Sequence, residues 1–398
     1  MSAVRITTAE AAARLGVRKE TIYAYVSRGF LTSHLGDDGR ASLFDASEVA
    51  SFRTRAGRRR EPRDLGTAIV SSLTHIDDHK ISIRGRDICE AARAGTAFET
   101  IAATLWLADD DRSEWRISPA VSAQCAAAQQ SLVVDAPLFE RVQLNLIIAS
   151  ANDMLRDDLR RPAVARAAAR AITTMVEGLP LASSAPGART RLSDRLLPRL
   201  TSMRANTKWR HALNASLVLL ADHDLAASTL AARVAASTRA HPYAVIATGL
   251  GAVRGPLHGA ASHDVVALLR DAERRGANAA IGDALRAGRG ITGWGHFLYP
   301  DGDPRATVLF DLVADATNDR TTLAIIEDVG AIMADRLGQP PNIDFALAAF
   351  AVLANLRADA TSTIFAIARS AGWIAHALEE YDEPPMRFRP RARYVAKS

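Results

Sequence analysis

Apolar residues recur at three- and four-residue spacing through most of the chain after Leu65, and this periodicity constrains the fold more than any other feature. Ile101 and Leu105 illustrate the spacing. A second example is the set Leu144, Ile147, Ile148 and Met154. Such spacing gives a helix one apolar side. We therefore expect a mainly α-helical protein with few strands, whose 398 residues are enough for two or three domains.

Three segments stand out from this pattern. SIRGRD at 82–87 indicates a short extended piece and a turn, and the Pro-, Ser- and Arg-rich stretch 178–200 predicts an irregular connection. The longest apolar run, 345–354, suits a buried helix and is too short to span a bilayer.

Composition and motifs exclude several classes. With 48% hydrophobic and 23% charged residues, the chain is not disordered throughout. Cys89 and Cys125 form no CxxC pair, so we expect two small buried side chains, with neither a disulfide nor a metal site. The first residues contain no apolar signal core, which predicts a cytoplasmic protein. Because the sequence has no dinucleotide fingerprint, P-loop or nucleophile elbow, no bound cofactor is expected.

The first 54 residues predict a separate small domain. Thr7 and Glu10 form a capping box for a helix that ends at Gly16, and a second helix runs from about Arg18 to Arg28 with Ile22 facing inward. A hairpin turn at 38–39 and a third helix over 45–55 follow. The unit resembles the small MerR-like or excisionase-like winged helix-turn-helix domains.

Positive charge is concentrated at this end. Residues 1–70 carry 12 Lys and Arg against 8 Asp and Glu, which is most of the net charge of +5. Segment 55–64 is a basic linker. A face of the second predicted helix has side chains suited to phosphates and base edges. They are Arg18, Lys19, Thr21, Tyr23 and Arg28. DNA binding and a role as a solvated cap or docking module both fit.

GWGHFLYPDGDPRA, at 293–306, is the clearest candidate site. Gly293 and Gly295 let the backbone pass close to a ligand around His296. Asp303 and the proline after it start a new segment with Arg305 in its first turn. The alternative is a solvated loop with incidental charge.

Two further histidines lie in similar surroundings. His223 ends an apolar helix over 212–221, where the helix dipole favours a cation, so that it either binds a carboxylate or caps its own helix. His258, in GPLHG, precedes a small pair and a helix that starts near His263. An imidazole there could donate a hydrogen bond to a carbonyl oxygen that gains charge.

Asp344 and Arg369 complete the set. Asp344 follows two prolines and precedes an apolar helix, which is typical of an N-cap but also of a partly desolvated general base. Arg369 lies within a predicted amphipathic helix over 364–379. Because a buried guanidinium without a partner is costly, it needs an anion from the protein or from a ligand.

Taken in order, these motifs resemble the citrate synthase family. ADHDLAAST, GPLHGAA, GWGHFLYPDGDPRA, NIDF, FAIARSAGWIAHALEE and RFRPRARY occur in the family's order and approximate spacing, and the resemblance covers 65–394. It implies a mainly α-helical fold with a large domain and a smaller one at about 262–358, within a body at 65–398. It also implies an active site in the cleft between them and a homodimer or a dimer-based hexamer.

The resemblance also implies roles. Asp344 would remove a proton from the acetyl-CoA methyl group, His258 would stabilise the enol oxygen, and His296 would polarise the oxaloacetate ketone. Substrate carboxylates would be held by His223, Arg305, Arg369 and Arg391, the last from the other subunit. Ala226, Ala260, Ser262 and Ala346 depart from the family pattern. Propionyl-CoA, giving 2-methylcitrate, is thus an alternative acyl donor, and a DNA-binding metabolite sensor is an alternative function.

Overall fold

The computed structural model describes residues 5–15, 22, 25–26, 31–35, 42–49, 69–77, 80–184, 190–204, 206–255, 258–259, 261–287, 292–357 and 359–388. Its N-terminal unit contains β1 (Arg5–Thr7), α1 (Thr8–Leu15), β2 (Ser33–Leu35) and β3 (Ser42–Asp45). β3 pairs antiparallel with both other strands, in the order β1-β3-β2. The β2–β3 pair agrees with the predicted hairpin. The sequence does not predict β1, because three residues are too few to show an alternating pattern.

A small apolar core of its own holds this unit together. The predicted capping box is confirmed, because the Thr7 amide donates to Glu10 Oε2 at 2.8 Å and the Glu10 amide donates to Thr7 Oγ1 at 3.3 Å. Ile22 is buried, as predicted. The five residues of the predicted DNA-facing surface and the linker 55–64 lie outside the described residues. The helix-turn-helix assignment therefore stays a prediction.

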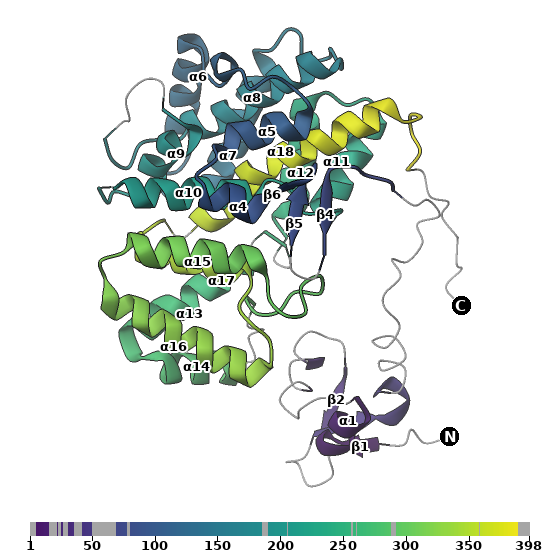
Figure 1. Cartoon of the computed structure of the whole chain (residues 1–398), viewed down its shortest axis with the longest axis vertical. Helices are drawn as coiled ribbons and strands as arrows, with labels where there is room; N and C mark the ends of the chain where they lie inside the picture. Colours follow the sequence, from purple (N-terminus) through teal and green to yellow (C-terminus); the bar gives the residue numbers. More distant parts are fainter. Residues whose placement is uncertain are drawn as a thin grey trace.

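From residue 69 on, the described chain is mainly helical, as predicted (Figure 1). It opens with an antiparallel sheet of β4 (Thr74–Ile76), β5 (Ile81–Ile83) and β6 (Arg86–Asp87). This sheet confirms the extended piece and turn predicted at 82–87. The first helices are α4 (Ile88–Arg93), α5 (Phe98–Trp106), the 3-10 turn η1 (Arg112–Glu114), α6 (Pro119–Gln130), α7 (Leu138–Ala151) and α8 (Arg161–Glu177). The next are α9 (Leu192–Leu200), α10 (Thr207–Leu220), α11 (Ala227–Ser237) and α12 (Pro242–Val253).

The last helix, α18 (Ala360–Asp382), runs through the middle of this first group of helices. It contacts α5, α8, α10, α11 and α12. Every residue from Ala360 to Leu378 is buried. The prediction of an amphipathic helix at 364–379 is therefore wrong, because neighbours cover the helix on all sides and its polar residues bind one another or the neighbouring helices.

A second group of helices lies beside the first (Figure 1). Its members are α13 (Ala261–Arg275), α14 (Ala277–Arg286), α15 (Pro304–Ala316), α16 (Arg320–Leu337) and α17 (Ile343–Leu353). α15 and α17 pack on each other, and α15 also contacts α10 and α4 of the first group. The predicted boundaries of a small domain at 262–358 stay a prediction.

Residues 178–200 differ from the irregular connection that the sequence predicts. Their second half is helix α9, which buries Leu192, Leu196, Leu197 and Leu200 on one side. The prediction is wrong because a proline such as Pro198 usually interrupts a helix. It is tolerated because it lies in the last turn, where its carbonyl accepts hydrogen bonds from the amides of residues 182 and 183. Of the two cysteines, Cys125 is fully buried as predicted, whereas Cys89 is only half-buried.

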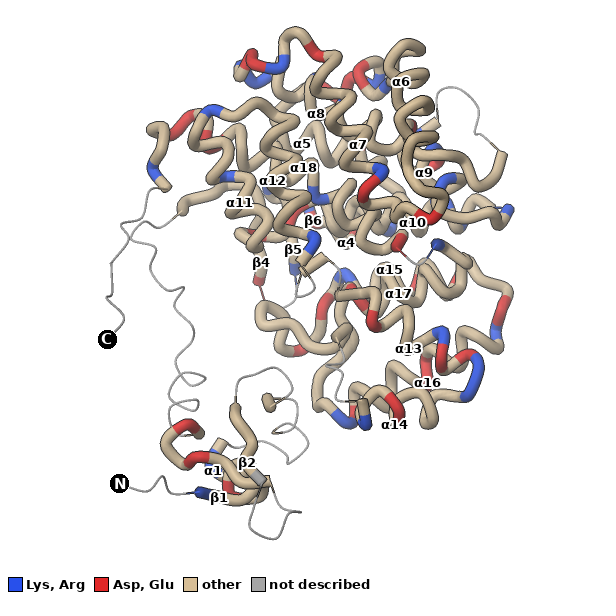
Figure 2. Tube along the Cα trace, turned by 180° about the vertical axis from the view of Figure 1, so that it is seen from behind, with Lys and Arg blue, Asp and Glu red and all other residues tan. Residues whose placement is uncertain are grey.

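Acidic and basic positions are scattered over the Cα trace, and many lie near one another (Figure 2). Around α13 and α14, Arg275 pairs with both Asp271 and Asp283. No helix among the described residues is long and apolar enough to cross a membrane.

Candidate active site

Two loops of the second helix group are tied together by their main chains. The Gly295 amide donates to the Pro340 carbonyl at 2.8 Å, and the Asn342 amide donates to the Gly293 carbonyl at 2.9 Å. The Asn342 side chain adds a bond to the Gly295 carbonyl at 3.0 Å. Gly293 and Gly295 have φ of +96° and +70°, which favours glycine. These bonds hold His296 close to the start of α17, and contact of the two glycines with a cofactor or ligand stays a prediction.

His296 lies in a cluster of rings. Its ring is 5.1 Å from that of His223 and 5.0 Å from that of Tyr299, and the Tyr299 hydroxyl is 3.0 Å from His223 Nε2. The Leu298 amide donates to His296 Nδ1 at 3.1 Å. Because Nδ1 accepts this bond, the proton of the neutral ring is on Nε2, which is then a donor.

Arg305 is buried next to these rings, in the first turn of α15, as the sequence predicts. Asp303 caps α15 and binds the guanidinium through two bonds, Nε to Oδ1 at 2.9 Å and Nη2 to Oδ2 at 2.8 Å. Burial would raise the pKa of Asp303, but Arg305 holds it below its usual value. Trp294, Tyr299 and Arg305 are all buried, so the alternative of a solvated loop is wrong.

Asp344 lies in the first turn of α17 but does not cap it. Asn342 is the N-cap, and its side chain accepts from the Asp344 amide at 3.0 Å. Burial raises the pKa of the Asp344 carboxyl to about 6, although Arg305 opposes the increase. Within the described residues its carboxylate accepts no hydrogen bond. It is therefore a stronger base than an exposed carboxylate.

Arg369, on α18, is buried with no carboxylate bound to it among the described residues. Its Nε donates to the Leu220 carbonyl at 2.9 Å, and the guanidinium lies over the Phe365 ring. Burial lowers the pKa of Arg369 to about 10, so the group is still charged at neutral pH. Asp222 is near enough to act on this charge without a direct ion pair, so both a protein carboxylate and a ligand stay as sources of the anion.

His258 lies just after α12, and Ser228 on α11 contacts its ring. Its Nε2 is 2.7 Å from Ser228 Oγ, and Ser228 Oγ also accepts from Trp373 Nε1 at 3.3 Å. The indole can only donate, so the serine hydrogen is free to bind His258 Nε2, and in that arrangement the ring proton is on Nδ1. His258 is thus a second neutral donor.

The three histidines are neutral at physiological pH. Burial lowers the pKa of both His258 and His296 to about 4, aided by Arg369 and Arg305 respectively. Burial, Arg305 and Arg369 hold the pKa of His223 well below its usual value. The prediction of a His223 cation favoured by the helix dipole is therefore wrong, because burial and the charges of Arg305 and Arg369 disfavour the protonated ring.

These six residues thus come together from both helix groups. His223, His258 and Arg369 belong to the first group, and the second contributes His296, Arg305 and Asp344. Arg391 lies outside the described residues. Sequence reasoning missed Ser228, Asp303 and Tyr299 as partners. Only Asp303 carries a local signal, since an Asp before a proline is a common helix start. The set combines one base, two neutral hydrogen-bond donors and an unpaired cation, which suits proton abstraction beside a carbonyl and binding of a carboxylate.

Comparison with known proteins gives a consistent result. A family model described as "Citrate synthase, C-terminal domain" matches residues 66–391. A "Citrate synthase" of Haloferax volcanii is 34% identical over 187 residues, which cover 46% of this chain and 49% of that protein. A "2-methylcitrate synthase 2" of Corynebacterium glutamicum is 35% identical over 183 residues, 45% of this chain and 48% of that protein. The chain thus spans about half the length of the curated relatives it matches.

Solved structures agree in fold. The citrate synthase of Thermotoga maritima has a TM-score of 0.66 at 25% identity and covers 83% of this chain and 94% of its own. A ternary complex of citrate synthase with carboxymethyl coenzyme A and oxaloacetate, from Thermoplasma acidophilum, has a TM-score of 0.68 at 21% identity with the same coverage. The mainly helical fold predicted for the body of the chain is confirmed.

Proposed function

This chain belongs to the citrate synthase family, and from that premise we propose that it condenses acetyl-CoA with oxaloacetate and hydrolyses the citryl thioester, releasing citrate and CoA. One observation carries the proposal. Asp344, a carboxylate with a raised pKa, interacts with the charge of Arg305, which also acts on neutral His296. Arg369 acts on neutral His258, and both arginines act on His223. Coenzyme A enters as part of a substrate, and no bound cofactor is required.

In the first step Asp344 removes a proton from the methyl group of the thioester. The thioester oxygen gains charge as the enol forms, and His258 Nδ1–H donates a hydrogen bond to it. Ser228 supports this role because it holds His258 in the required tautomer. Because the α-proton is weakly acidic, base and donor must act together, and each contributes about a hundred- to ten-thousand-fold.

In the second step the enol carbon attacks the ketone carbon of oxaloacetate. His296 Nε2–H polarises that ketone and gives its proton to the alkoxide. Arg305, Arg369 and His223 bind the two carboxylates, and Arg391 of the other subunit adds a further contact. Water then attacks the thioester carbonyl, and the CoA thiol leaves. The unpaired guanidinium of Arg369 supports this assignment of the anionic substrate.

The acyl donor is either acetyl-CoA or propionyl-CoA. Curated relatives named citrate synthase and 2-methylcitrate synthase match this chain at 34% and 35% identity, so identity does not separate the two donors. Ala346, which departs from the family pattern, is fully buried two residues after the base. Propionyl-CoA is therefore the second substrate to test.

We further propose that the protein is a homodimer. The apolar stripe of Leu144, Ile147 and Ile148 on α7 is directed outward, and Ile147 is 65% exposed. Beyond α7, Met154 and Leu155 are also exposed. Adjacent apolar side chains on an outer surface favour a protein partner. Sedimentation analysis tests the mass, and a monomer at micromolar concentration would overturn this part.

The main test is thiol release with oxaloacetate and either acetyl-CoA or propionyl-CoA, with products identified by mass spectrometry. We expect citrate with acetyl-CoA, and release that depends on oxaloacetate. The Asp344→Asn variant is the control for contaminating activity. If oxaloacetate binds but no thiol is released with either donor, the metabolite sensor becomes the better function, with DNA binding through residues 1–60 as its output.

A further inference from the structure

Helix α18 holds the chain just before His223 at three successive points. Arg369 Nε donates to the Leu220 carbonyl at 2.9 Å, and the Gly372 amide donates to the Ala221 carbonyl at 3.0 Å. His376 Nε2 lies 3.4 Å from Asp222 Oδ1. The three helix residues are three and four apart, so they share one side of α18.

The approach of the two segments is close. A Cβ atom at position 372 would lie 2.3 Å from Asp222 Oδ1 and 2.6 Å from the Ala221 carbonyl oxygen. Only glycine fits there. The loop that carries His223 is therefore seated directly on the backbone of α18, and small movements of the helix contacts are passed to the loop.

Asp222 is fully buried and is held from two sides. Thr74, on β4, donates to Oδ2, and His376 lies next to Oδ1. Burial alone would raise the pKa of Asp222, but His376, Arg369 and Thr74 hold it below its usual value. Asp222 is therefore a carboxylate whose orientation depends on His376 and Thr74.

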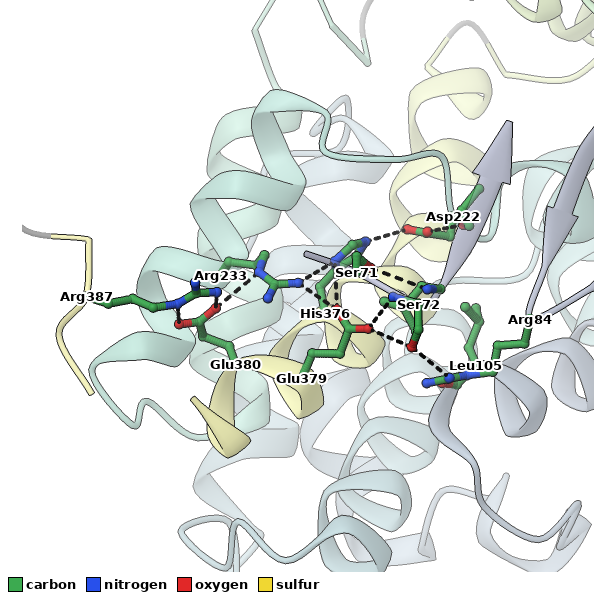
Figure 3. Close-up of polar contacts among 12 residues, drawn as sticks. Ser71, Ser72, Arg84, Leu105, Asp222, Arg233, His376, Glu379, Glu380 and Arg387 are labelled. Atoms are coloured by element: carbon green, nitrogen blue, oxygen red, sulfur yellow. Dashed lines mark hydrogen bonds and ion pairs between the residues drawn. The ribbon is translucent and has the colours of Figure 1, made fainter. Parts of the chain in front are cut away.

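A contact at the other ring nitrogen, Nδ1, decides which nitrogen of a neutral His376 carries the proton (Figure 3). His376 Nδ1 lies 3.0 Å from Arg233 Nη1, which can only donate, so Nδ1 is the acceptor and the ring proton is on Nε2, facing Asp222. Arg233 is fully buried and is fixed in turn by Glu379 at 2.8 Å and Glu380 at 3.1 Å. Arg387 binds the far side of Glu380.

We propose that His376 is a positioning residue for the 2-oxo dicarboxylate site, which acts by orienting Asp222 and thereby His223. The His223 imidazole is neutral and has the Tyr299 hydroxyl as a partner, so its direction depends on the main chain that Asp222 anchors. His376 contacts neither substrate nor reacting atoms. This inference rests on the proposed function, since His223 is there a ligand of oxaloacetate.

The test compares His376→Leu with the wild type by isothermal titration of oxaloacetate and by steady-state kinetics. We expect the Kd and the KM for oxaloacetate to rise by about tenfold or more, because buried Asp222 loses the polar group that faces its Oδ1. The KM for acetyl-CoA should not change, and kcat should fall less than about threefold, since no transition-state contact is lost. His376→Gln, which has both an acceptor and a donor, should restore much of the affinity.

Two further variants separate positioning from general damage to the fold. Glu379 binds Arg233 and lies 4.0 Å from His376 Nδ1, so Glu379→Gln disturbs the same network. It does not contact Asp222, so the variant should leave oxaloacetate affinity unchanged. Asp222→Asn should weaken oxaloacetate binding as His376→Leu does. The double variant of His376→Leu and Asp222→Asn should lose no more oxaloacetate affinity than the weaker-binding single variant, because both changes act through one contact. If His376→Leu does not fold, His376→Gln and Asp222→Asn carry the comparison.

The outcomes distinguish the two proposals. If the wild type condenses the substrates and oxaloacetate affinity is equal in all variants, the positioning role is wrong and the proposed function stands. An equal loss of affinity in Glu379→Gln and His376→Leu also overturns positioning. If the wild type releases no thiol but binds oxaloacetate in a manner that depends on His376, the inference stands and the proposed function fails.

Discussion

Two groups of buried charged residues lie along α18, and they differ in how their cations are paired. Toward the end of the helix, Arg233 and Glu380 are both fully buried, and Arg233 binds Glu380 and Glu379. About three turns earlier, Arg369 is buried with no described carboxylate bound to it. A buried ion costs several kcal/mol unless it is paired. Under the proposed function, Arg369 is the cation whose carboxylate partner the substrate would supply, whereas Arg233 is paired within the protein.

The largest expected effect breaks the paired group. Arg233→Met leaves Glu379 without its buried partner and Glu380 with Arg387 alone, so the free energy of unfolding should fall by about 3–5 kcal/mol. Urea denaturation measures it. The matched control is Lys208→Met, which breaks the exposed pair with Asp315 and should cost less than about 1 kcal/mol. If the two variants lose equal stability, the paired group is not structural.

The second effect concerns the base in the unpaired group. Asp344→Asn should lower kcat by at least about a hundredfold, the scale of a lost general base. Oxaloacetate affinity should change little, because this residue acts on the other substrate. Stopped-flow and steady-state thiol release measure kcat, and titration measures affinity. Turnover near that of the wild type would exclude Asp344 as the base.

The same residue predicts the pH dependence. Burial raises the pKa of Asp344 to about 6, so the carboxylate forms only as the pH rises through 6. His258 and His296, with pKa lowered to about 4, are already neutral there. We therefore expect kcat to increase from pH 5 to 7 with one apparent pKa near 6, measured with saturating substrates. A plateau that extends down to pH 5 contradicts the raised pKa.

The third effect is on affinity alone. Arg369→Met removes the unpaired cation, so the KM for oxaloacetate should rise about ten- to a hundredfold, the value of hydrogen bonds to a charged group. Stability should fall less than in Arg233→Met, because the change removes a hydrogen bond to the Leu220 carbonyl, a contact with the Phe365 ring and an attraction to Asp222, but no direct ion pair. Kinetics and urea denaturation on one preparation test both parts. A stability loss as large as that of Arg233→Met would show that Arg369 is as important for stability as the paired group.

The smallest effect is expected from the N-terminal unit, whose apolar core is separate from that of the body. Removing residues 1–60 should abolish DNA retention in a gel-shift titration and change kcat less than about twofold.

With the full chain, each phosphate contact should add about 0.9 to the slope of log affinity against log salt. Two symmetric half-sites are expected in the preferred DNA. If no fragment is preferred over random DNA but turnover changes on truncation, the unit is a docking cap.

The sequence predicts most of the fold but only part of the site. Helical periodicity and the Asp303–Pro304 start place α15 correctly, since these signals are local. Motif order identifies His258, His296 and Asp344. The tautomers of His258 and His296 depend on Ser228 and on the Leu298 amide, and the role of His376 depends on Arg233, which is 143 residues away. Such contacts exist only after folding, so no pattern along the chain shows them. Likewise, the polar residues of α18 suggest an exposed side in the sequence, but distant helices cover them in the fold.

The tie between the loops at 293–295 and 340–342 closes a ring in the chain. The segment that contains α15 and α16 begins and ends at this tie. The main-chain bonds of the tie do not depend on side-chain identity. Extra residues inserted at the exposed turn beside Asn318 would lengthen this ring without separating His296 from Asp344, since loop closure costs little more as a loop grows. This turn is therefore a place where related lineages could gain length, and where a reporter domain could be grafted while activity is retained.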